Sequence, residues 1–148
     1  MALEVGLDLK LYRNTGTYGT PVWNEVTIAQ DLNFKVTKER LEATLRGAAW
    51  TTNAAGALKA ELPLTILCDQ TIDDYDVLRD AAVTRATTLD IAMANGAIAT
   101  TGTRYMRMIS AVFDWDKGEP VNGISTVSCT LAPAYNTSQA APAYTTVP

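Results

Sequence analysis

The chain alternates apolar and polar residues over most of its length, and this pattern constrains its fold more than any other feature. Val5, Leu7, Leu9 and Leu11 alternate with polar or charged neighbours, and residues 58–68 repeat the pattern. A period of two places successive side chains on opposite faces of a strand, so each such run predicts a half-buried β-strand. The runs cover residues 4–12, 22–28, 31–37, 41–46, 58–68, 88–93, 103–116 and 126–131. We expect seven to nine strands.

One segment follows a helical period instead. Tyr75, Leu78 and Ala82 lie on one stripe of residues 71–82, with Thr71 in the N-cap position. Aspartates occupy the first turns, which suits the helix dipole, and we expect a solvent-exposed helix start rather than a metal site. The sequence therefore predicts a mainly β fold, an antiparallel β-sandwich or barrel with one α-helix on a face and a long inter-strand loop.

Three segments interrupt the alternation. Residues 46–56 lose all periodicity and predict the long exposed loop, in which Trp50 either packs within the chain or anchors a neighbouring subunit. Pro63 falls within a strand and requires an edge position or a bulge. Residues 134–148 are of low complexity, so we expect an arm that is disordered or ordered on a neighbour, following a β domain of residues 1–133.

Composition excludes several kinds of chemistry. The formal net charge is -4, which argues against a basic surface that grips phosphates, and the chain has no histidine for imidazole catalysis or zinc binding. Cys68 and Cys129 fall on apolar sides of their strands and are expected to be inert thiols. We expect no catalytic residues, metal or cofactor. The N-terminus shows no secretory leader and no apolar run is long enough to span a membrane, so we expect a chain made soluble in the cytosol.

Short sequence patterns along the chain resemble the major tail tube protein of long-tailed, siphovirus-type bacteriophages. The resemblance extends over about the first nine-tenths of the chain. The patterns are LKLY at residues 9–12, WNEV at 23–26, DLNF at 31–34, Leu45-Arg46 followed by Trp50, AELPLTILCD at 60–69, DDYDVL at 73–78, LDIA at 89–92 and TLAP at 130–133.

This resemblance implies a structural virion protein without enzymatic activity. Its subunits would form stacked hexameric rings around a lumen that conducts the genome, as part of the virion tail. The implied partners are further copies of the chain, a tape-measure protein inside the tube, tail terminator and distal tail proteins at its ends, and passing double-stranded DNA that is not bound specifically. No membrane is involved.

The resemblance also suggests two sets of functional residues. Polar strand residues without clustered cations are the candidates for the lumen wall, because Lys and Arg would hold phosphates. These candidates are Asp31, Asn33, Thr37, Thr126, Ser128 and Thr130. The candidates for contact between rings lie in the long loop and are Arg46, Trp50, Thr51 and Asn53.

Other functions stay open at this stage. The tube protein of a contractile tail or of a type VI-like secretion machine would share the architecture. A carbohydrate-binding β-sandwich would need aromatic residues in a row, and Tyr105, Phe113 and Trp115 approach that arrangement. A hydrolase that uses only Asp and Glu is a further alternative, although no pair of carboxylates has a spacing that indicates one.

Overall fold

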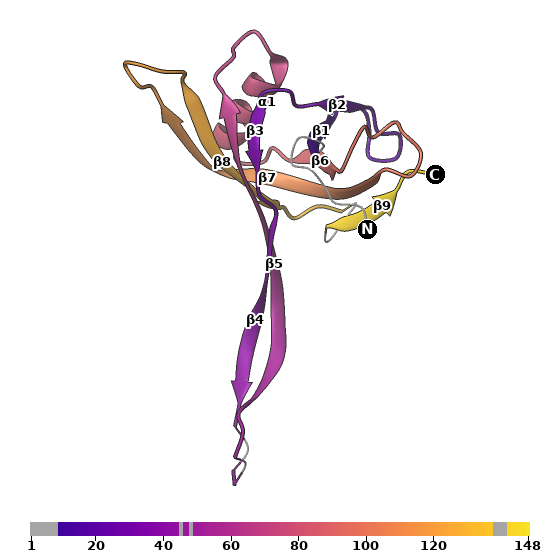
Figure 1. The fold of residues 1–148 in the computed structure, drawn as a ribbon, viewed down its shortest axis with the longest axis vertical. Helices are drawn as coiled ribbons and strands as arrows, with labels where there is room; N and C mark the ends of the chain where they lie inside the picture. The colour runs from indigo at the N-terminus through magenta and orange to yellow at the C-terminus, as the bar shows by residue number, and fades with distance from the viewer. Residues whose placement is uncertain (1–8, 45, 48, 138–141) are drawn as a thin grey trace.

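The computed structural model describes residues 9–44, 46, 47, 49–137 and 142–148, and shows a long curled antiparallel β-sheet with one helix (Figure 1). This confirms the mainly β fold predicted from the alternation. The strands are β1 (Lys10–Asn14), β2 (Trp23–Glu25), β3 (Ala29–Leu32), β4 (Lys35–Ala43), β5 (Thr52–Leu67), β6 (Leu89–Ala94), β7 (Arg104–Gly118), β8 (Thr126–Pro133) and β9 (Ala143–Thr146). The helix is α1 (Asp73–Val83).

The sheet runs in the order β2-β1-β6-β7-β8-β5-β3, with β4 paired to β5 and β9 paired to β7. All of these pairs are antiparallel. The two longest strands each serve two regions. β7 pairs with β6 through its first half and with β8 through its second half, whereas β5 leaves the sheet and continues into a projecting hairpin with β4 (Figure 1).

The main core lies between one face of the sheet and α1. Tyr75 and Leu78 of the helix pack against the buried residues of β5, β7 and β8, as their helical spacing predicts. In the strands the buried residues alternate as expected, with Leu62, Ile66 and Leu131 fully enclosed. Burying each such side chain contributes about 1.5–3 kcal/mol, so this face supplies most of the apolar driving force.

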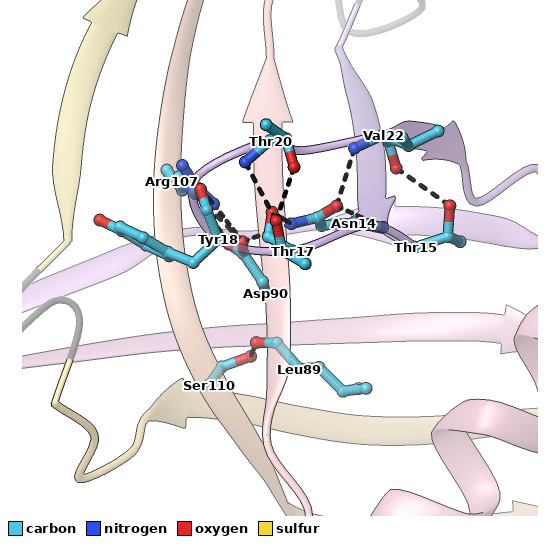
Figure 2. A network of polar contacts seen from close by, with 11 residues as sticks. Asn14, Thr15, Thr17, Tyr18, Thr20, Val22, Leu89, Asp90, Arg107 and Ser110 are labelled. Carbon is cyan, nitrogen blue, oxygen red and sulfur yellow. Dashed lines mark hydrogen bonds and ion pairs between the residues drawn. The ribbon is translucent and has the colours of Figure 1, made fainter.

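A smaller cluster of buried residues, Tyr12, Ala92 and Ala94, lies on the opposite face, and Trp23, Ile98 and Tyr105 pack against it. The loop between β1 and β2 reaches β7 on this side. Arg107 of β7 holds this loop: its guanidinium binds Asp90 through both nitrogens Nε and Nη2, and it donates to the carbonyl of Tyr18 at 2.9 Å (Figure 2). The same guanidinium lies 3.9 Å from the Tyr18 ring centroid. Asn14 completes the network by donating to Asp90 at 2.9 Å. The Asp90 carboxylate raises the pKa of Arg107.

The start of the helix differs from the sequence prediction in two ways. The N-cap is Ile72, without a side-chain hydrogen bond, and Thr71 instead bonds to Asp69 through both its amide and its hydroxyl. Asp74 is buried and accepts from Nε of Arg13 at 2.8 Å. Asp74 therefore ties α1 to the sheet, and the prediction of a wholly solvent-exposed acidic turn is wrong for this residue.

A β-bulge in β7 changes the face on which Trp115 lies. The register with β8 shifts between Val112 and Asp114, so Phe113 is the extra residue. Trp115 thereby returns to the core side, where it packs against Tyr75 with ring centroids 5.9 Å apart. Tyr105 packs against Trp23 on the other face. The row of three aromatics considered for carbohydrate binding does not exist.

The exposed loop predicted at residues 46–56 is shorter than expected. Residues 52–56 belong to β5 and pair with β4, so only residues 44–51 connect the two strands. This part of β5 is rich in Ala and exposed on both faces, and it therefore shows no polar–apolar contrast in sequence.

Pro63 is accommodated in a way that the sequence did not predict. It lies inside β5, paired with Thr130 of β8, rather than at an edge or a bulge of its own strand. Its carbonyl accepts from the amide of Asn33, and the N and O of one strand residue point to the same side. The missing N–H of Pro63 therefore faces the break between β3 and β4.

The end of the chain forms β9, which pairs with residues 104–107 of β7. The expectation that this arm is disordered or ordered only on a neighbour is wrong for Ala143–Thr146. The chemistry of Cys129 agrees with prediction: burial raises the pKa of its thiol to about 12, and both Cys68 and Cys129 are free. Val5, Leu7 and Leu45 of the predicted strands lie outside the described residues.

Candidate assembly surfaces

The uncovered face of the sheet, opposite the main core, carries a row of polar residues across four strands. Asp31 of β3 pairs with Thr65 of β5, Thr65 pairs with Ser128 of β8, and Ser128 pairs with Asp116 of β7. Directly paired residues share a face, so the row presents two hydroxyls between two carboxylates. The carboxylates at its ends are exposed.

A second row lies next to the first. Thr130 pairs with both Pro63 and Asp114, and Asn33 donates its amide to the Pro63 carbonyl. Asp31, Asn33 and Asp114 border a shallow hollow of about 240 Å³ over this surface. We call the two rows together the polar face. They contain three aspartates and no lysine or arginine, so the local charge is negative.

The six candidate lumen residues lie on the same side of the sheet. Asp31, Asn33, Ser128 and Thr130 belong to the polar face, and Thr126 continues it along β8 beside Leu67. Thr37 lies farther away, on the projecting hairpin opposite Lys59. Lys35 and Lys59 lie on this same side of the hairpin, so the negative charge of the polar face does not continue into the hairpin.

Sequence reasoning missed three members of the polar face. Thr65 belongs to a strand considered only for its apolar side, and Asp114 and Asp116 lie at the end of the predicted strand 103–116, whose polar residues were not considered for the lumen. The strand in fact extends to Gly118. One signal was available in the partner strand β8, where the apolar residues are Val127, Cys129 and Leu131. Their pairing fixes which residues of β7 face outward after the bulge.

The second surface is the hairpin formed by β4 and residues 52–61 of β5, which projects away from the body of the molecule (Figure 1). All nine residues of β4 are exposed. Leu41, Val36 and Leu58 keep 49%, 55% and 66% of their surface accessible. A two-stranded ribbon of this kind has little stability by itself, and exposed apolar side chains on it indicate a surface that binds another molecule.

The four candidate contact residues gather at the end of this hairpin. Arg46, Trp50 and Thr51 lie in the connection, and Asn53 pairs with Glu42 next to it. Trp50 is 84% exposed, so it does not pack within the described part of its own chain. The hydroxyl of Thr52 closes the ribbon by donating to the Ala43 carbonyl at 2.9 Å.

Neither surface resembles a catalytic centre. Within the described residues no group of three or more His, Cys, Asp or Glu side chains could hold a metal ion. The helix found in that same part of the chain is α1, which at 11 residues is too short to cross a bilayer.

Comparison with solved structures places this fold. A chain in the tail of an empty gene transfer agent (GTA) particle, computed with C6 symmetry, superposes with a TM-score of 0.75 at 13% identity, covering 97% of this chain and 99% of that one. The SPP1 tail tube subunit gives a TM-score of 0.71 at 10% identity, covering 86% of this chain and 74% of that one.

A chain from the sheath/tube terminator of an extracellular contractile injection system, PVC, is also similar. It gives a TM-score of 0.68 at 8% identity, with 98% of both chains covered. No protein-family model and no curated protein matches the sequence. The chain therefore has the fold of tail tube subunits, on structural rather than sequence similarity.

Proposed function

We propose that this protein is the structural subunit of a bacteriophage-type tail tube, assembling into stacked hexameric rings whose lumen conducts the genome. The observation that carries the proposal is the tail-tube fold over nearly the whole chain, including a projecting hairpin that the monomer leaves unpacked. The six-fold symmetry used for the GTA tail supports the ring number.

The strands β3, β5, β8 and the second half of β7 are the part that would line the tube. Among the described residues, β3 has a strand partner on one side only, and β7 pairs with β6 only as far as Ser110. Two free edges thus flank a four-stranded sheet, and pairing them between subunits closes a ring. Six copies give a barrel of about 24 strands with a backbone diameter of roughly 48 Å at ~4.8 Å spacing and ~40° tilt. Duplex DNA and a tape-measure protein would pass through such a barrel.

The polar face is our candidate for the wall of this lumen. A wall that binds phosphates through Lys or Arg releases counterions and holds DNA at every ring. Asp31, Asp114 and Asp116 repel the polyanion instead, while Thr65 and Ser128 present hydroxyls that water solvates. Such a surface lets DNA slide without specific binding, and no catalysis, cofactor or metal is required of it.

The end of the hairpin is our candidate for contact between rings. Arg46, Trp50 and Thr51 lie in the connection at the end of the hairpin and Asn53 lies next to it. The hairpin projects away from the four-stranded sheet, so its end is free to meet another copy (Figure 1). An exposed Trp surrounded by small polar residues has the composition of an interface anchor. At the ends of the tube the same surfaces would meet tail terminator and distal tail proteins, so the protein would reside in the virion tail.

A tube inside a contractile sheath is the second candidate. It is favoured by the similarity to the contractile injection system chains, with TM-scores of 0.68 and 0.65. Micrographs of the native particles distinguish the two, because a contractile tail shows a sheath around the tube and a siphovirus-type tail is bare.

Negative-stain electron microscopy of the concentrated, purified protein tests the proposal. We expect hollow tubes of uniform width or rings with a central hole, and sedimentation that depends on concentration. A protein that stays monomeric across the accessible concentration range would refute a self-assembling tube.

A further inference from the structure

A groove lies at the base of the hairpin, between the ribbon and the C-terminal arm. It has a volume of about 290 Å³. Its apolar lining comes from Phe34, Val36, Leu58, Pro133, Pro142 and Tyr144. Val36, Leu58 and Tyr144 remain 55%, 66% and 76% exposed. The groove is thus formed by four separate segments of the chain and is not filled by any of the described residues.

The most exposed tryptophan of the chain lies at the other end of the same hairpin. Trp50 is separated from Val36 by seven strand residues of β4 and part of the connection, which corresponds to roughly 25–30 Å of extended ribbon. Trp50 therefore cannot reach the groove of its own chain. The same apolar side chain can reach the groove of another copy.

The apolar residues of the ribbon change face between its base and its end. Near the base, Val36 pairs with Ala60, on the core side of the sheet. Near the end, Leu41 pairs with Ala54, and because residues 36 and 41 are an odd number apart they lie on opposite faces of β4. The register of β4 against β5 shifts between these two pairs, because Lys38 pairs with Leu58 whereas Arg40 pairs with Ala55.

Separate apolar surfaces at the end and at the base of the hairpin allow one copy to bind another. A two-fold axis pairs the end of each copy with the base of its partner and closes the contact at two copies, whereas a head-to-tail contact leaves one end and one base free and repeats. Stacked rings require a contact that repeats, so we place the hairpin end of one copy over the hairpin base of the next.

We propose that Trp50 of each subunit inserts into the groove formed by Phe34, Val36, Leu58 and Tyr144 of a subunit in the adjacent ring. This inference rests on the proposed function, and it adds the receiving surface that the hairpin end requires. It assigns β9 a role in assembly, since Tyr144 and Pro142 form one wall of the groove. The contact repeats from ring to ring because each copy carries both the anchor and the groove.

Disulfide crosslinking tests the geometry in assembled tubes. The double variant Thr51→Cys with Tyr144→Cys is expected to give, on oxidation, a ladder of crosslinked chains that extends beyond six. The wild type, each single variant, and Thr51→Cys with Tyr135→Cys are the controls, because Tyr135 is 96% exposed and is not part of the groove. Dimers only, a ladder that ends at six, or a ladder equally strong with Tyr135→Cys would overturn the proposal.

A mutant cycle tests the energetics. Trp50→Ala and Tyr144→Ala are each expected to raise the concentration needed for tube formation about tenfold or more, and the double variant to raise it little further. Tyr135→Ala is the matched control and should leave it unchanged. Effects that simply add would show that the two side chains do not meet, even though tubes form. Absence of tubes from the wild type would instead refute the proposed function itself.

Discussion

The interactions of Arg107 lead to a prediction about stability. Its guanidinium binds Asp90 through Nε at 3.0 Å and through Nη2, donates to the Tyr18 carbonyl at 2.9 Å and stacks on the Tyr18 ring. Hydrogen bonds to charged groups contribute about 1.5–3 kcal/mol, and a ring contact near the surface about 0.5–1 kcal/mol. The side chains of Arg107 and Asp90 are each 14% exposed, so removing one partner should cost less free energy than it does in a fully buried ion pair. Arg107→Ala should lower the free energy of unfolding by about 2–3 kcal/mol.

Urea denaturation of the unassembled protein measures this change, at a concentration below that of any tube formation. Arg107→Lys is the control: it keeps the charge but cannot form the two-nitrogen contact, and should lose about half as much. Hydrogen exchange should show that protection is lost first in the loop between β1 and β2, which Arg107 and Asn14 hold. A loss below about 0.5 kcal/mol, or a loss spread evenly over the molecule, would refute the structural role derived from this network.

Three other perturbations have defined outcomes. Leu131→Ala, at a position with no exposed surface, should cost about 3–4 kcal/mol in urea denaturation, and a cost below 1 kcal/mol would contradict the assigned core. Burial raises the pKa of Cys129 from 9.0 to about 12, so as the pH rises the thiol loses its proton in the unfolded chain before it does so in the folded one. The stabilisation from this group is complete below pH 9 and is lost between about pH 9 and 12. The free energy of unfolding should therefore fall over this range, and it should fall less in Cys129→Ala. A constant difference between the two proteins over that range would argue against the assignment. Asp31→Lys combined with Asp114→Lys should leave tubes intact but make them retain DNA in a manner that weakens as salt is raised, measured by filter binding; unchanged retention would remove the polar face from the lumen.

The alternation of residues was sufficient to predict much of the sheet. β6, β7 and β8 lie where the pattern placed them, and the buried positions of β8 are the predicted ones. β8 has one face in the core and one face outside it, so its sequence records both, whereas β6 is buried on both faces. Helix α1 was predicted because Tyr75 and Leu78 face the main core at helical spacing.

The errors fall where a distant residue or a local irregularity decides the outcome. Asp74 is buried because Arg13, 61 positions away, reaches it, and no local pattern reports that contact. Trp115 changes face through a bulge of one residue at Phe113. β9 is a strand because the edge of β7 is available to it, although its own sequence is of low complexity.

The candidate surfaces were predicted in part. The six lumen candidates share one side of the sheet because β3 and β8 are both partners of β5, a relation that the sequence order conceals. Asp114 and Asp116 were missed because the bulge at Phe113 changes which residues at the end of the predicted strand 103–116 face outward. The groove beside Tyr144 joins four segments between 34 and 144 in the chain and could be found only in the folded structure.

Cryo-electron microscopy of tubes assembled from the purified protein tests the central claim most directly. We expect six subunits per ring, a continuous β-barrel around an open bore, and density for Asp31, Ser128 and Asp116 on the bore surface. A tube whose bore is lined by the α1 side of the sheet, or the absence of any ring or tube, would contradict the account.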